Sequence, residues 1–184
     1  MVMTALASNL LDALGEARDA DTALELIDHA RRVIAGPGIF SIQVNVTTAR
    51  DPKGELRLQR FYASPAAAVR WPVNGVKRKT YTPWTETLFV RGQPFVAAGA
   101  DTMARAFDDY DQMKAMDIDS VVNVPLMKGN LCYATFNVFG TKGEWQPHQV
   151  LALRLLALAA ARWVPPAADL MYSFDNHEAA AQAA

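Results

Sequence analysis

The fold of this chain is decided by Val122-Asn123-Val124-Pro125-Leu126, followed after a short gap by Leu131-Cys132-Tyr133-Ala134-Thr135-Phe136-Asn137-Val138. Both runs are dominated by β-branched, aliphatic and aromatic residues, the composition typical of strands. We therefore predict a strand over Ser120–Leu126, a turn at Met127–Asn130 and a second strand over Leu131–Phe139. This hairpin is the strongest sheet signal in the sequence.

Two further strands are expected before this hairpin. Polar and apolar residues alternate from Ile39 to Val46, which predicts a strand with one face in water. A turn at Arg50–Gly54 then leads into Glu55–Ala63, where alternation puts four residues on one side: Leu56, Leu58, Arg60 and Tyr62. The two segments form a predicted antiparallel hairpin.

Helices are expected at both ends of the chain. Thr4–Leu14 is a short helical stretch, and Asp21 is the predicted N-cap of a second helix that stops at Gly36-Pro37-Gly38. Pro147 opens a final helix whose leucines point to nearly every side over Val150–Val164. A helix that is apolar all round is expected to be buried on more than one face.

The middle of the chain predicts short elements. Lys77-Arg78-Lys79 is interpreted as a solvated loop, because prolines and a glycine interrupt the region around it. Thr82 and Pro83 are a predicted N-cap and first residue of a short helix. Pro94–Ala98 is expected to be a brief strand, and Gly99–Ala115 to contain helical turns.

Composition excludes several classes of protein. The 184 residues are 51% hydrophobic and 20% charged, which favours a globular chain over a disordered one. With 18 basic and 19 acidic residues there is no positive field for nucleic acid. Arg154 and Arg162 interrupt the longest apolar stretch, so no membrane span is expected, and the N-terminus lacks the features of a secretory signal. A single cysteine excludes an internal disulfide, and we expect a cytoplasmic protein.

Terminal helices around an antiparallel sheet with helical insertions describe an α+β sandwich. Within it, the hairpin of Val124-Pro125-Leu126, a turn and a hydrophobic strand ending near Asn137 resembles the late hairpin of GAF domains. The resemblance runs from about Asp21 to Val164 and departs from the family at Ala134, where glycine is usual.

The resemblance implies a PAS-related fold. Its central antiparallel sheet would carry the N- and C-terminal helices on one face and the helical insertions, over a pocket, on the other. It divides the chain into an N-terminal helical segment (1–20), a GAF-like domain (21–165) and a flexible tail (166–184).

Several known GAF subtypes are excluded because this sequence lacks their characteristic residues. The signature of the cyclic-nucleotide binders cannot be placed, and Cys132 is followed by Tyr133 rather than by the histidine common at bilin attachment sites. Haem-binding members supply an axial histidine from the pocket, whereas all three histidines here lie on flanking segments: His29, His148 and His177. Free methionine sulfoxide reductases need a second cysteine, which is missing. Asp108, Asp111 and Cys132 match the iron-binding nitric oxide sensors poorly in spacing, so we expect no cofactor and no metal.

The resemblance places the ligand cavity between the sheet and the insertions Tyr81–Phe89, Phe95–Ala98 and Asp101–Asp111. The candidate ligand-binding residues are Tyr62, Trp84, Phe95, Arg105, Phe107, Asp108, Tyr110, Asn123 and Phe136.

Two interpretations of Asp101–Asp111 stay open. In one, it is a lid whose Phe107 and Tyr110 stack on the ligand while Arg105 or an acid orients it. In the other, it is a solvated helix-turn with Asp101 and Asp108 as caps and the aromatic residues in the core. Trp84 is similarly open between a pocket wall and a packing role.

The leading functional hypothesis is a non-catalytic module that binds a small, partly apolar metabolite and forms a homodimer. The N-terminal helices and Val150–Val164 are the predicted dimer surface. One alternative is an enzyme acting on a small aromatic or carboxylated metabolite, with acid/base groups from Asp108, Asp109 or Asp111. Another is an adaptor whose pocket is filled by its own side chains. Cys132 is predicted to be an inert buried thiol.

Overall fold

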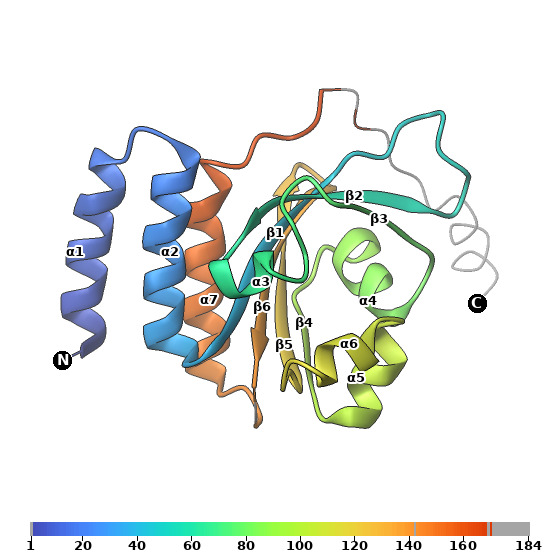
Figure 1. The fold of residues 1–184 in the computed structure, drawn as a ribbon. Coiled ribbons are helices and arrows are strands. Elements are labelled where there is room, and N and C mark those ends of the chain that lie inside the picture. The colour runs from blue at the N-terminus through green and yellow to red at the C-terminus, as the bar shows by residue number, and fades with distance from the viewer. Residues whose placement is uncertain (1, 142, 169, 171–184) are drawn as a thin grey trace.

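The computed structural model describes residues 2–141, 143–168 and 170. A six-stranded sheet divides the molecule into two layers, and every pairing between its neighbouring strands is antiparallel (Figure 1). The strand order is β3-β2-β1-β6-β5-β4. The strands are β1 (Gly38–Asn45), β2 (Leu56–Ala63), β3 (Val76–Lys79), β4 (Phe95–Ala98), β5 (Ser120–Lys128) and β6 (Leu131–Gly140). The predicted α+β, GAF-like architecture is confirmed.

The terminal helices lie together beside one face of the sheet: α1 (Val2–Glu16), α2 (Ala20–Ala35) and α7 (Pro147–Ala161) (Figure 1). They enclose what we call the helix-side core, built around Leu24, Phe40, Phe136 and Leu153. The other face carries the insertions α3 (Pro65–Ala68), α4 (Pro83–Thr85), the π-helical turn Glu86–Val90, α5 (Ala100–Ala106) and α6 (Tyr110–Lys114). These pack over an insertion-side core that includes Trp71, Trp84, Phe107 and Phe139.

The hairpin predicted from the Pro125 region forms from β5 and β6. β5 and β6 pair Asn123 with Asn137 and Val124 with Phe136, so adjacent residues face opposite cores. Phe136 therefore lies on the helix side, against Phe40 at a ring-centroid distance of 4.5 Å. Asn123 and Asn137 face the insertions, and both are almost completely buried.

The polar face of β1 is buried, contrary to the prediction that it is wet. Ser41 and Asn45 are 2% and 0% exposed. Alternation correctly separates the two faces, but it cannot show that insertions from later in the chain cover the polar one.

A β-bulge overturns the predicted alternation in β2. Ile42 pairs with Tyr62 while Gln43 pairs with Arg60, which leaves Phe61 as an extra residue. An extra residue reverses the side on which the following side chain points. Leu56, Leu58 and Arg60 therefore face the insertions, whereas Tyr62 lies in the helix-side core.

Local signals at helix ends are largely confirmed. Gly36, at φ 73°, ends α2, and Pro83 and Pro147 open their helices as expected. The N-cap of α2 is Asp19 rather than Asp21, because Asp19 accepts a hydrogen bond of 2.8 Å from the backbone nitrogen of Thr22.

Helix α7 is buried on one side and exposed on the other. Leu153 and Leu156 pack in the helix-side core, but Leu151, Leu155 and Leu158 are 57%, 59% and 72% exposed. Within the described ranges no helix combines the length and apolar character needed to cross a membrane. Most of the predicted flexible tail lies outside the described residues.

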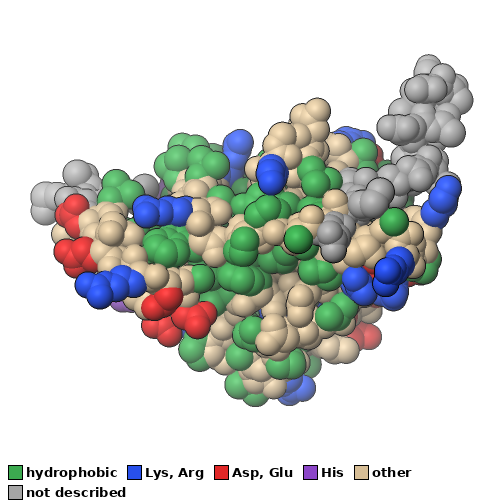
Figure 2. Space-filling model, turned by 90° about the horizontal axis from the view of Figure 1, so that it is seen from above, with side chains coloured by type: hydrophobic (Ala, Val, Ile, Leu, Met, Phe, Trp, Pro, Cys, Tyr) green, Lys and Arg blue, Asp and Glu red, His purple; other side chains and the backbone are tan. Residues whose placement is uncertain are grey.

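The surface seen from above mixes both signs of charge. Hydrophobic side chains gather in its middle, while Lys, Arg, Asp and Glu lie mainly around its edge (Figure 2). The described residues therefore show no broad field of one sign on this face.

Cys132 is fully buried, as predicted. Its Sγ lies 3.3 Å from the carbonyl oxygen of Ala134, and burial raises the pKa of the thiol to about 12. A thiol attacks disulfide reagents as the thiolate, which is scarce at neutral pH when the pKa is this high.

We therefore expect Cys132 to resist labelling by a soluble aromatic disulfide in the native protein. The reaction should be at least about 100-fold slower than in guanidinium chloride, because it must wait for the core to open. Absorbance of the released thiolate measures both rates. Equal rates in native and denatured protein would contradict the burial of this strand.

Candidate functional site

A small cavity of about 30 Å³ lies between the sheet and the insertions. This volume has room for about two water molecules. Its lining comes from β1, β2, β3, β5, β6 and the insertions: Ser41, Gln43, Arg60, Trp71, Lys77, Lys79, Trp84, Phe107, Asp109, Met113, Asn123, Asn137 and Phe139.

The floor of the cavity is a hydrogen-bonded row of polar side chains. Ser41, Asn137 and Asn123 stand side by side on the neighbouring strands β1, β6 and β5. Asn123 Nδ2 donates to Asn137 Oδ1 at 2.9 Å, and Asn137 Nδ2 donates to Thr135 Oγ1 at 3.0 Å. The amide of Asn123 also accepts a bond of 3.0 Å from Trp84 Nε1. One face of a buried sheet thus carries a chain of satisfied amides.

The walls of the cavity are aromatic. Thr82 caps the short helix α4, which brings Trp84 over the sheet. Trp84 packs beside Phe107, with ring centroids 6.1 Å apart, and Trp71 packs beside Phe139 at 5.7 Å. Trp84 therefore lines the cavity and anchors α4 at once, so both of its predicted roles describe its position.

A cluster of cations occupies the third side. We use the name cation cluster for Arg60, Lys77 and Lys79, which converge from β2 and β3. Lys77 Nζ donates a hydrogen bond to Asp109 Oδ2, and Lys79 Nζ lies 3.9 Å from Asp109 Oδ1. Asp109 is the one carboxylate among the described lining residues, against three basic groups.

Arg60 is held in an unusual environment. It is 4% exposed, its Nη1 lies 3.4 Å from the carbonyl oxygen of Pro72, and its guanidinium carbon lies 5.7 Å from the centroid of Trp71. Its Nε has no hydrogen-bond partner among the described residues. Burial lowers the pKa of Arg60, and the charge of Asp109 opposes that shift.

The pKa values of Asp109 and Lys79 depend on burial and on the charges around them. Burial lowers the pKa of Lys79, the charge of Asp109 opposes this, and Lys77 adds to it. Burial by itself would raise the pKa of Asp109, but the hydrogen bond from Lys77 and the charges of Lys77 and Lys79 outweigh burial and lower it. Asp109 is therefore an ionised carboxylate at neutral pH.

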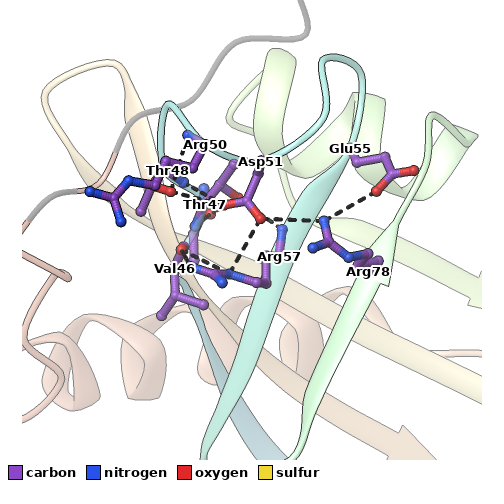
Figure 3. A network of polar contacts seen from close by, with 9 residues as sticks. Val46, Thr47, Thr48, Arg50, Asp51, Glu55, Arg57 and Arg78 are labelled. Atoms are coloured by element: carbon purple, nitrogen blue, oxygen red, sulfur yellow. Dashed lines mark hydrogen bonds and ion pairs between the residues drawn. The ribbon is translucent and has the colours of Figure 1, made fainter.

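The inward direction of the lysines depends on strand β3, so the prediction of a solvated loop at 77–79 is wrong. β3 pairs with β2, and its side chains alternate. Arg78 points outward, where its Nη1 lies 3.3 Å from both Asp51 Oδ1 and Glu55 Oε2 (Figure 3). Lys77 and Lys79 must then face the insertions.

The outer network also ties β3 to the turn between β1 and β2. Asp51 Oδ2 accepts a bond of 2.8 Å from the backbone nitrogen of Thr48, and Arg57 Nη2 donates to the carbonyl of Val46 at 2.9 Å (Figure 3). The bond from Thr48, opposed by burial and aided by Arg57 and Arg78, lowers the pKa of Asp51. Asp51 is therefore charged and available to hold Arg78.

Three of the predicted site residues line the cavity: Trp84, Phe107 and Asn123. Phe95 and Tyr110 lie outside it. Phe95 meets Phe107 edge-on at 6.1 Å, and Tyr110 donates a hydrogen bond of 3.0 Å to Asp119.

The other predicted residues lie away from the cavity. Arg105 and Asp108 are exposed. Phe136 and Tyr62 lie on the opposite face of the sheet, Tyr62 because of the β-bulge. Burial, aided by nearby carboxylates, raises the pKa of the Tyr62 hydroxyl to about 12.

The acidic run 101–111 combines features of both predicted interpretations. Phe107 and Tyr110 are buried, as the helix-turn interpretation requires. The expected caps are wrong, because Gly99 and Asp109 occupy the N-cap positions of α5 and α6 in place of Asp101 and Asp108. Asp109 makes no capping bond and turns instead toward the lysines.

Sequence reasoning missed most of the polar lining. Ser41, Gln43 and Asn137 were available as polar residues inside otherwise hydrophobic strands. Such residues are a detectable signal when the strand is buried on both faces. Lys77 and Lys79 carried no comparable signal, since a Lys-Arg-Lys run is typical of a solvated segment. Among the described residues, no group of His, Cys, Asp and Glu is arranged to hold a metal ion.

The substitution Asn123→Ala tests the floor of the cavity. It leaves Trp84 Nε1 and Asn137 Oδ1 without their partner, so we expect a loss of about 1–3 kcal/mol in the free energy of unfolding. Chemical denaturation followed by tryptophan fluorescence measures this loss. The control Asn130→Ala, at an exposed turn position, should change it by about 0.5 kcal/mol or less. Similar losses in both variants would show that the amide row does not stabilise the fold.

Known proteins with the same architecture are found by sequence and by structure. The model of the GAF domain family matches residues 4–162. Comparison with curated proteins gives no match. The GAF domain from a phosphoenolpyruvate-protein phosphotransferase of Coxiella burnetii superposes with a TM-score of 0.67 at 12% identity, covering 99% of this chain and 97% of that one.

Two further structures share the fold. A methyl-accepting chemotaxis protein fragment, residues 122 to 287, gives a TM-score of 0.58 at 18% identity, with 86% and 94% coverage of this chain and that one. The chromophore-binding domain of the bacteriophytochrome RpBphP3 from R. palustris gives 0.61 at 10% identity, over 87% of this chain and 59% of that one. The family match spans nearly the whole chain, and the structure has the corresponding fold. This chain belongs to the GAF domain family.

Proposed function

We propose that this GAF domain is a non-catalytic binding module that holds a small molecule in the cavity between the sheet and the insertions. The observation that carries the proposal is the chemistry of the lining. Aromatic walls meet a floor of polar groups and the Nε of Arg60, which has no hydrogen-bond partner within the described part of the chain. Small-molecule sites combine apolar walls with a few convergent polar groups in this way.

The lining also suggests which parts of a ligand it would contact. Trp71, Trp84 and Phe107 offer flat apolar surface to a ring or a short carbon skeleton. Ser41 and Gln43 offer hydrogen-bonding groups on the floor. Because the cavity holds only about 30 Å³, a metabolite must displace part of the insertions to enter.

The arrangement favours binding over acid/base catalysis. A general acid or base works best with a pKa near the working pH. The pKa of Asp109 is lowered by its lysine partners once they outweigh burial, and Asp108 and Asp111 are exposed outside the cavity. The adaptor alternative expects a pocket filled by its own side chains, whereas a cavity of about 30 Å³ with a partly polar lining remains here.

Native mass spectrometry tests the function. We expect a small molecule to co-purify with the chain and to leave on denaturation. Gln43→Leu removes a polar group from the floor and should lower the bound fraction. Gln59→Leu, on the neighbouring strand position that pairs with Val44, is its matched control. A bare polypeptide mass, with no shift in melting temperature across a metabolite library, would contradict the proposal.

We also propose that the domain forms a homodimer through Val150–Val164 and the N-terminal helices. Leu151, Leu155 and Leu158 are exposed on one side of α7, and Leu11 of α1 is 66% exposed. Residues four and seven apart share one helix face, so the leucines form a continuous apolar stripe. A stripe of this kind is stabilised when a second copy covers it.

The substitution Leu155→Glu should convert the dimer into a monomer, because it places a charge inside the apolar contact. Light scattering coupled to size exclusion measures the mass of each species. The control Val69→Glu lies beside α3, on the insertion side, and should leave the dimer intact. A wild-type protein that remains a monomer at high concentration would overturn the proposed dimer.

A further inference from the structure

The cation cluster is charged beyond what its neighbours neutralise. Three basic side chains line the cavity with one carboxylate, that of Asp109. The ring of Trp71 lies close to two of them, with its centroid 5.7 Å from Arg60 Cζ and 5.4 Å from Lys77 Nζ. An aromatic face attracts cations and holds them in place without neutralising their charge.

Asp109 pairs with only part of the cation cluster. Its Oδ2 accepts the hydrogen bond from Lys77, but its Oδ1 accepts none from the residues that the structure describes and lies 3.9 Å from Lys79 Nζ. Asp109 forms no hydrogen bond or ion pair with Arg60, whose Nε donates to no acceptor among the described residues. A buried donor without a partner is costly, and for a guanidinium the preferred partner is a carboxylate or phosphate bound by two nitrogens.

The position of Asp109 in the chain is also informative. It sits in the short link between α5 and α6, two residues after the wall residue Phe107. The link is therefore held by the aromatic contacts of Phe107 with Trp84 of α4 and Phe95 of β4, and by the ion pairs of Asp109 with the lysines of β3. Any group that takes the lysines from Asp109 releases one of these attachments.

Resting on the proposed function, we infer that the ligand carries a compact anionic group, a carboxylate or a phosphate, which binds Arg60, Lys77 and Lys79 in place of the Asp109 carboxylate. Asp109 is then an internal competitor that holds the lysines until the ligand arrives. Its displacement opens the link between α5 and α6 and enlarges the small cavity. The apolar part of the ligand lies against Trp71, Trp84 and Phe107.

The proposal makes opposite predictions for the acid and the bases. Asp109→Asn removes the competitor and should tighten the binding of anions. Lys79→Met removes a charged donor and should weaken it. One charge-assisted hydrogen bond is worth about a 10-fold change in affinity or more, so we expect changes of at least about 10-fold in each direction. A role in folding alone would weaken binding in both variants.

The experiment uses three aromatic probes of similar size: benzoate, phenyl phosphate and the neutral benzamide. Tryptophan fluorescence reports binding, because two of the four tryptophans, Trp71 and Trp84, line the cavity, and calorimetry measures affinity. Arg78→Met is the matched control, because it removes a positive charge from the same strand on the outer face. Circular dichroism and melting curves show whether each variant is folded, and Lys77→Met replaces Lys79→Met if the latter is not.

We expect benzoate or phenyl phosphate to bind better than benzamide. Affinity for the anion should rise at least about 10-fold in Asp109→Asn and fall at least about 10-fold in Lys79→Met. It should change less than about 2-fold in Arg78→Met. Comparison of the two anions decides between carboxylate and phosphate. Binding of all three probes with no dependence on these charges would overturn the anionic ligand and leave the binding module intact. If no probe binds any folded variant, the anionic ligand is overturned. A bare native mass in the same preparation, together with no shift in melting temperature across the metabolite library, would overturn the proposed function as well.

Discussion

Once helical insertions cover a sheet, every polar side chain on the covered face needs a partner within the protein. The row Trp84–Asn123–Asn137–Thr135 meets this constraint, with bonds of 2.9 to 3.0 Å between side chains of three elements. The row also fixes α4 over the sheet through the indole of Trp84. The cavity exists because these amides satisfy one another and leave a polar floor beneath aromatic walls.

The charged side chains on the two faces of β3 also have partners within the protein. Outside, Arg78 meets Asp51 and Glu55 near solvent, where ion pairs contribute little to stability but do orient side chains. Inside, Lys77 and Lys79 share Asp109, and Arg60 stands behind them. Alternation along the four residues of β3 thus turns two lysines of a basic run toward the cavity.

The β-bulge at Phe61 decides which side chains of β2 face the cavity. Without it, Arg60 and Tyr62 would face the same side of β2. With it, Arg60 points to the cavity and Tyr62 packs against Phe40 in the helix-side core at a centroid distance of 5.4 Å. The misplacement of Tyr62 has this single physical cause, while Phe136 was misplaced because alternation does not say which face meets the insertions.

Local chemistry in the sequence determined most of the elements and the family, although not strand β3. The hairpin around Pro125, the glycine stop at Gly36 and the proline starts at Pro83 and Pro147 depend on neighbouring residues alone. Tertiary structure decided the site. Lys77 and Lys79 meet Asp109, and Arg60 lines the same cavity, only because strand pairing and the insertions bring together residues up to 49 positions apart. Burial, charge pairing and the position of a bulge depend on the whole fold, so no short stretch of sequence can specify them.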